Sequence, residues 1–264
     1  MFSLLRNWFH PAESSAASAI SPALWQSVEE GLPALDMLNP GERQNLRSLA
    51  LDFLAAKELT GGGDFALTDE VRLGVALIAC LPILKLGLAW YEGWVGVIIY
   101  PGDFLIPRQL TDASGVLHQY EDVVAGEAWQ GGPVVLSWFD EPTPGVNAIL
   151  HEFAHKLDMQ NGGDANGLPP LHPDMARCKW VDVFSAAFKD FRRRVHHAEH
   201  RGQDTELDPY AAQSPAEFFA VMSEAFFETP LLLLEQYPAV YEQLKCFYRQ
   251  DPALREAALT EHQP

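Results

Sequence analysis

The sequence predicts an α+β protein, and three observations support this prediction. Segments with apolar residues at helical spacing lie toward both ends of the chain. Between them, from Trp94 to about Phe139, the residues are rich in Val, Ile and aromatic types and are broken by Gly and Pro, as in short strands. No strong linker interrupts this order. We therefore expect one domain over 20–252, with a flexible tail at 1–19 and a second tail at 253–264.

Three helices are expected before the strands, at 22–30, from Asn39 to the glycines at 61–63, and from Thr68 to about Trp90. Asn39 begins an Asn-Pro-Gly-Glu sequence, which supplies an N-cap, a proline in the first turn and a glutamate at the third position. The third helix contains the longest apolar run, 12 residues from Leu73 to Leu84, which is too short to span a bilayer.

The expected strands lie in WVGVIIYPGDFLIP, GVLHQYEDVVAG and GPVVLSWF. Helices return after Pro144, with the best apolar patterns at 145–159, 174–196, 215–228 and 231–249. The cluster from His196 to His200 follows three arginines and is expected to be a solvated helix end.

The composition argues against several functional classes. With 36 acidic and 18 basic side chains the formal charge is -18, so the protein should repel phosphate backbones and anionic lipid. We expect no direct nucleic-acid binding and no membrane partner. The three cysteines are far apart and in no CxxC spacing, which argues against a disulfide framework and a thiolate zinc site. Together with a poor secretory signal at the N-terminus, this favours a cytoplasmic protein.

One short motif carries metal chemistry. In LHEFAHKLD, His151 and His155 are four residues apart, so on a helix both imidazoles can reach one ion. Glu152 would lie beside the metal, where a carboxylate can take a proton from an activated water. This HExxH pattern is the zincin signature. The alternative is a polar helix face that carries two hydrogen-bonded histidines.

A third metal ligand would strengthen the metal hypothesis. The metzincin pattern fails, because Asp158 and Asn161 stand where it needs glycine and histidine. A later helix offers Glu217, Glu224 and Glu228 near one face. Glu228 is disfavoured by its closeness to a proline. Glu217 could instead complete a capping box with the serine three residues before it, so chemistry alone leaves Glu217 and Glu224 equally favoured.

Three further features could serve the same site. Tyr210 precedes the candidate ligand helix and could bring its hydroxyl to an oxyanion, or it could be an ordinary buried tyrosine. The strand GPVVLSW could pair with an extended peptide along its edge. Asp158 could hold a histidine in one tautomer, or it could be the polar end of the helix.

The longer motifs match a known family. HEFAHKLDMQNG and DPYAAQSPAEFFAVMSEAFFETP, together with LPILKLGLAWYEG and GPVVLSW, resemble the bacterial Mlc titration factor A family over about Trp25 to Pro252. The resemblance implies a zincin-like, gluzincin-type metallopeptidase core, with a small mixed sheet, an HExxH helix and additional helices around them. By motif, His151, His155 and Glu217 would hold one Zn²⁺, Glu152 would be the general base, and Tyr210 would assist catalysis.

The functional hypothesis is therefore a zinc-dependent peptidase that acts on peptide substrates. Aminopeptidase activity and binding to the repressor Mlc, a regulator of glucose-uptake genes, are implied by the resemblance. The acidic composition suits docking to a partly basic DNA-binding protein. The alternative is a non-catalytic binding protein that sequesters the repressor.

Overall fold

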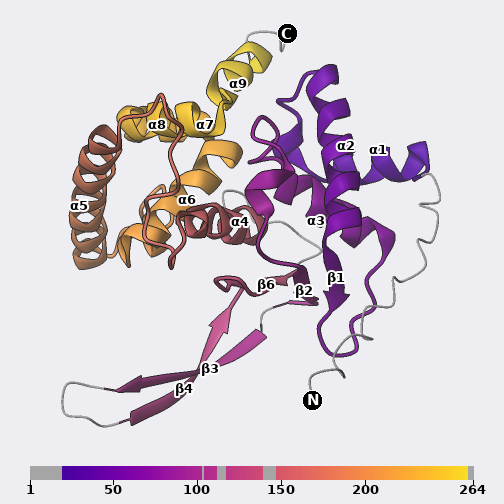
Figure 1. Cartoon of the computed structure of the whole chain (residues 1–264). Coiled ribbons are helices and arrows are strands. Elements are labelled where there is room, and N and C mark those ends of the chain that lie inside the picture. The colour runs from indigo at the N-terminus through magenta and orange to yellow at the C-terminus, as the bar shows by residue number, and fades with distance from the viewer. Residues whose placement is uncertain (1–19, 103, 112–116, 139–146, 261–264) are drawn as a thin grey trace, which may run out of the picture.

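A helical body lies above a small sheet, and a two-stranded hairpin projects from it, in the computed structural model of the chain (Figure 1). The structure describes residues 20–102, 104–111, 117–138 and 147–260. The predicted α+β class is confirmed. No helix within these ranges is both long and apolar enough to cross a membrane.

The central sheet has four strands in the order β1-β2-β6-β5. They are β1 (Glu58–Gly61), β2 (Gly96–Tyr100), β6 (Val134–Ser137) and β5 (Gly126–Ala128). β1, β2 and β6 run parallel to one another, whereas β5 is antiparallel to β6. The sheet is therefore small and mixed, and β1 and β5 are its two edge strands.

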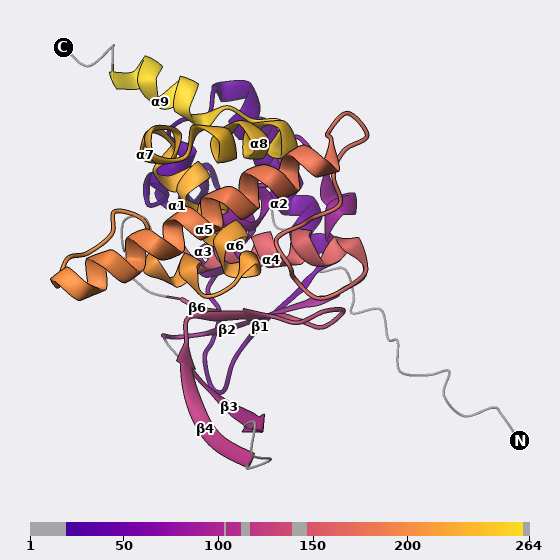
Figure 2. The same cartoon turned by 90° about the vertical axis from the view of Figure 1, so that its left-hand side faces the viewer.

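The hairpin consists of β3 (Phe104–Thr111) and β4 (Leu117–Val124), which pair antiparallel as a separate ribbon. β4 ends two residues before β5 begins. The ribbon points away from the helices in both views (Figures 1 and 2).

One face of the central sheet packs against the helices, which lie above it in Figure 2. Val97 pairs with Val134 and Ile99 with Leu136, and all four side chains are fully buried in the core. Because alternate residues of a strand point to opposite faces, these pairs define the core side of the sheet.

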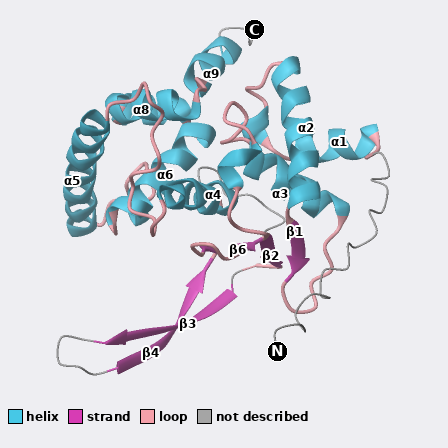
Figure 3. Ribbon diagram, viewed as in Figure 1, coloured by secondary structure: helices cyan, strands magenta, loops and turns pink. Residues whose placement is uncertain are grey.

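The helices and 3₁₀ turns surround this core (Figure 3). The helices are α1 (Pro22–Glu30), α2 (Pro40–Ala56), α3 (Asp69–Cys80), α4 (Ala148–Asp158), α5 (Arg177–Arg201), α6 (Pro215–Glu228), α7 (Pro230–Gln236), α8 (Pro238–Tyr248) and α9 (Pro252–Thr260). Short 3₁₀ turns lie at Pro33–Leu35, Leu88–Tyr91, Met159–Asn161 and Pro209–Ala212. The predicted N-cap at Asn39 is confirmed. It forms a capping box, since the Asn39 side chain accepts from the Glu42 amide at 3.0 Å and Glu42 accepts from the Asn39 amide.

Several predicted boundaries were wrong. α2 ends at Ala56, because the next residues pair with β2 and form a strand that the sequence did not reveal. α3 ends at Cys80, ahead of Pro82, which has no N–H to continue the helix. The helix expected over 231–249 is two helices, since Pro238 starts a new one.

The predicted domain limits stay predictions. The structure places α9 in the segment expected to be a C-terminal tail, and Ala253 within it is buried. The expected N-terminal tail at 1–19 lies outside the described residues, as do residues 145 and 146 of the predicted helix over 145–159.

A cluster of aromatic rings fixes α4 against the rest of the body. The Phe153 ring centroid lies 5.7 Å from that of Phe53 on α2, 5.1 Å from that of Tyr91 and 5.8 Å from that of Trp94. Such pairs stabilise beyond the area they bury, typically by about 0.5–1.5 kcal/mol each. The apolar side of α4 is therefore held firmly.

Lys57 supports this cluster from within. Its side chain is buried and its Nζ donates to the Tyr91 and Trp94 carbonyls, in the latter case at 2.6 Å. The ammonium also lies 3.9 Å from the Trp94 ring centroid, and burial lowers the pKa of Lys57. The buried charge is compensated by these contacts.

Lys57→Met should lower the free energy of unfolding by about 2–4 kcal/mol, because it leaves two buried carbonyls without a donor. Urea unfolding of both proteins measures this. Lys85→Met is the control, since Lys85 is more exposed and pairs with Glu42 at 2.9 Å, a contact whose loss should cost about 0–1 kcal/mol. Equal small losses in both variants would contradict the assigned role of Lys57.

Candidate metal centre

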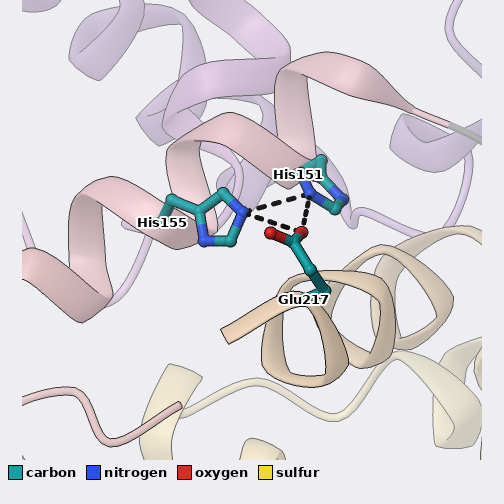
Figure 4. Close-up of side chains that lie close together, drawn as sticks. All are labelled: His151, His155 and Glu217. Carbon is teal, nitrogen blue, oxygen red and sulfur yellow. Dashed lines mark hydrogen bonds and ion pairs between the residues drawn. The ribbon is translucent and has the colours of Figure 1, made fainter. Parts of the chain in front are cut away.

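α4 presents its two histidines on the side opposite its apolar residues. The Asn147 side chain caps the helix by accepting from the Leu150 amide at 3.1 Å. Leu150, Phe153 and Leu157 are buried in the core. The spacing of four therefore places His151 and His155 side by side, facing α6 (Figure 4).

Three potential ligand atoms converge between α4 and α6. His151 Nε2 lies 3.1 Å from His155 Nε2, and Glu217 Oε2 lies 2.9 Å and 3.2 Å from these two nitrogens (Figure 4). Two imidazole nitrogens and a carboxylate oxygen are a donor set that zinc prefers. Within the described part of the chain, these residues form the group of three that could hold a metal ion.

The structure also distinguishes Glu217 from Glu224, which residue chemistry alone left equally favoured as the third ligand. The Ser214 hydroxyl accepts from the Glu217 amide at 3.2 Å and caps α6, while the Glu217 carboxylate turns to the histidines. Glu224 lies two turns further along α6, behind His151, with Oε1 2.6 Å from His151 Nδ1. Its Oε2 accepts from the Asn147 amide at 2.8 Å. Glu217 therefore lies with the two histidines in the group that could hold a metal ion, whereas Glu224 contacts the other nitrogen of the His151 ring.

The electrostatics favour positive charge between these side chains. Burial works to lower the pKa of His151, but hydrogen bonds with Glu217 and Glu224 outweigh it and raise that pKa to about 10. Burial works to raise the pKa of Glu217, but its contacts with both histidines lower it to about 2. Either a bound proton or a bound metal ion would supply this positive charge.

Glu152 lies next to the candidate ligands in a closely packed position. It is buried, and burial raises its pKa to about 7 against the opposing effect of the two histidines. Gly126 of β5 packs directly on it, because a Cβ at Gly126 would lie 2.5 Å from Glu152 Cγ and 2.6 Å from Oε1. Among the described residues, Glu152 Oε2 is buried and has no hydrogen-bond partner. One carboxylate oxygen therefore has hydrogen-bonding capacity that the described residues do not use.

Tyr210 lies at the rim of the same site. The 3₁₀ turn Pro209–Ala212 carries it, and the Asp208 side chain accepts from its amide at 2.8 Å. Its ring centroid is 5.8 Å from that of His151, and the side chain is 42% exposed. It is therefore not a buried core tyrosine.

One other expectation about the site was wrong. The strand within GPVVLSW is β6, which lies between β2 and β5, so both its edges are paired and the edge strand beside it is β5. Of the two interpretations of Asp158, the structure supports the polar end of the helix: Asp158 is the last residue of α4, is fully buried and accepts three backbone N–H bonds from residues 166–168. The histidines at 196, 197 and 200 are exposed near the end of α5, as predicted.

The sequence did not reveal the contribution of Lys156 and Gly126. Lys156 is buried and donates to the carbonyls of Trp129 and Gly132, at 2.5 Å and 2.8 Å, and so holds the turn between β5 and β6. Burial lowers the pKa of Lys156 to about 8, and nearby Lys57 adds to this effect. The Trp129 and Gly132 carbonyls lie far from Lys156 in the sequence. The only sequence signal for Lys156 is therefore its position directly after the HExxH motif.

A helix with two histidines and a glutamate, completed by a carboxylate from a second helix, is the arrangement of a metallopeptidase. The comparisons agree. The family model described as glucose-regulated metallo-peptidase M90 matches residues 6–249, and the chain belongs to this family. Membership in a metallopeptidase family implies that the protein binds a metal ion.

Curated relatives match over nearly the whole chain. Mlc titration factor A of Klebsiella pneumoniae (strain 342) is 36% identical over 252 residues, which cover 94% of this chain and 93% of the relative. Mlc titration factor A of Yersinia pestis (strain Pestoides F) is 37% identical over 264 residues, which cover 94% and 91%. The resemblance stated from the motifs is thereby confirmed.

Glu224→Gln should weaken the affinity for a divalent metal ion about 10-fold to 100-fold, because a neutral amide holds the His151 ring less firmly than a carboxylate. Competition with a chromophoric chelator measures the dissociation constant. Glu228→Gln is the control on the same helix, since Glu228 accepts from the Asn147 side chain at 2.7 Å and is not in hydrogen-bond contact with the histidine. Equal affinities in wild type and Glu224→Gln would contradict the orienting role.

Proposed function

We propose that the chain is a zinc-dependent peptidase with a zincin-like core of the gluzincin type. In this proposal His151, His155 and Glu217 hold one Zn²⁺, Glu152 is the general base and Tyr210 supports the oxyanion. The observation that carries it is the convergence of three ligand atoms beside a buried carboxylate. When bound, zinc would supply Lewis acidity, which polarises a carbonyl and makes water more acidic.

The protein's own residues would perform the proton transfers. Glu152 takes a proton from the attacking water through its unpartnered Oε2 and passes it to the leaving amine. Burial favours this role, because a carboxyl group with a pKa near neutrality both accepts and returns a proton readily. Tyr210 is exposed beside His151, so its hydroxyl can donate to the oxygen that gains charge.

β5 is the strand placed to align a peptide substrate. It is terminal in the sheet, and Gly126 brings its backbone against Glu152. An extended peptide that pairs with this strand would lie next to the general base. The strand selected from the sequence, β6, is one position further inside the sheet.

On the family resemblance, we also propose aminopeptidase action. From the cysteine pattern and the poor secretory signal, we keep the prediction that the protein works in the cytoplasm. A panel of aminoacyl chromogenic amides tests the first point, since an aminopeptidase cleaves unblocked amides and leaves their N-acetylated forms intact.

We also propose that the chain binds the repressor Mlc. Support comes from the relatives, which carry the name Mlc titration factor A, and from the formal charge of -18, which suits a partly basic DNA-binding partner. The second candidate function is sequestration of this repressor without catalysis. Release of Mlc from operator DNA by a Glu152→Gln variant is the expected result if binding is independent of hydrolysis. If this variant fails to release Mlc, the release of the repressor depends on peptide hydrolysis.

Glu152→Gln should retain one zinc per chain and lose turnover of the amide panel by about 10²-fold to 10⁴-fold, because the amide cannot take the proton. Zinc analysis and initial rates measure the two parts separately, with a chelator as a further check. Glu242→Gln, on the exposed side of α8, is the matched control and should behave as wild type. Full activity in Glu152→Gln would refute the assignment of the base.

A further inference from the structure

Asp158 is a fully buried carboxylate at the last residue of the ligand helix α4. Its Oδ2 accepts from the amides of Asn166 and Gly167, at 2.7 Å and 2.6 Å, and its Oδ1 accepts from the Leu168 amide at 3.1 Å. Burial raises the pKa of Asp158 and these bonds oppose that effect. A buried carboxylate with three backbone donors holds those donors in a fixed arrangement.

The loop that Asp158 holds packs on the first turn of α6. Gly167 has a φ of +81°, and a Cβ there would lie 2.5 Å from the Pro215 carbonyl oxygen. On its other side, the loop is fixed by α5, since Trp180 Nε1 donates to the Gly167 carbonyl at 2.9 Å. At Gly167 the loop therefore contacts both α5 and the first turn of α6.

The first turn of α6 needs such support. Pro215 stands two residues before Glu217, and the first amides of a helix lack intrahelical acceptors, so helix ends fray easily. A metal ligand at this place must hold its position within about 0.5 Å to keep the productive geometry. The Ser214 cap fixes the amide of Glu217, and the Gly167 contact fixes Pro215.

We propose that Asp158 is a positioning residue for the third metal ligand. It connects α4, which carries His151 and His155, through Gly167 to the turn of α6 that carries Glu217. The separation between the histidine pair and the glutamate is thereby set by a contiguous series of contacts. The inference rests on the proposed metal site and names a residue outside the ligand set.

Asp158→Asn tests it. The asparagine side chain keeps one acceptor but turns an NH₂ group toward backbone donors, so at least one bond to the loop is lost. We expect the zinc dissociation constant to rise about 10-fold to 100-fold, as for other groups that orient ligands. The visible absorption of the Co²⁺-substituted protein should change as well, because it reports the ligand geometry.

Asp251→Asn is the matched control. Asp251 accepts from the Tyr241 hydroxyl at 2.6 Å and lies between α8 and α9. Both variants should melt at a lower temperature than wild type as metal-free proteins. Only Asp158→Asn should lose zinc affinity and alter the Co²⁺ spectrum. If Asp158→Asn lowers the melting temperature alone, its role is structural and the inference is wrong.

Trp180→Phe provides a second, milder variant that keeps the ring stacked on Phe184, at 4.2 Å between centroids, and removes the N–H donated to Gly167. A loss of zinc affinity of roughly 3-fold to 10-fold is expected from one hydrogen bond. This variant decides the question if Asp158→Asn does not fold, and unchanged affinity would then overturn the inference. Failure of the wild type to bind zinc would instead reject the proposed function itself.

Discussion

The rest of the site depends on the contacts that two glutamates of α6 make with the two nitrogens of the His151 ring. Glu217 lies 2.9 Å from Nε2 and Glu224 lies 2.6 Å from Nδ1. Because the two glutamates are seven residues apart, two turns of one helix place both carboxylates along the same imidazole. The ring then has one orientation, which directs Nε2 to the point where His155 and Glu217 also converge. A partly buried imidazole held in this way is ready to bind a cation.

The helix α4 is also the element that fixes the surroundings of the site. Its apolar side packs Phe153 among the rings of Phe53, Tyr91 and Trp94. Two buried charged side chains follow His155 and contact different parts of the protein. Lys156 donates to carbonyls in the turn between β5 and β6, and Asp158 accepts from the Asn166 amide in the loop that packs on the first turn of α6. The helix α4 is therefore connected both to the edge strand β5 and to α6, which carries Glu217, the proposed third ligand.

Features that depend on the spacing of residues within one helix could be predicted from the sequence. Features that depend on contacts between residues far apart in the chain could not. The spacing of His151 and His155 within one helix is local, as is the Asn39 cap, and both formed as expected. The choice between Glu217 and Glu224 required the crossing of two helices, so residue chemistry alone could not make it and the family motif did. β1 has the weak strand sequence Glu-Leu-Thr-Gly and forms because β2 pairs with it. The close approach of Gly126 to Glu152 joins residues far apart in the chain.

An anomalous diffraction map, collected at the zinc edge from crystals of the zinc-loaded protein, would locate the metal directly. The proposed ligand set predicts one strong peak within about 2.0–2.2 Å of His151 Nε2, His155 Nε2 and a Glu217 carboxylate oxygen. A peak bound by Glu224 in place of Glu217, or one at the exposed histidines of α5 with none between α4 and α6, would contradict it.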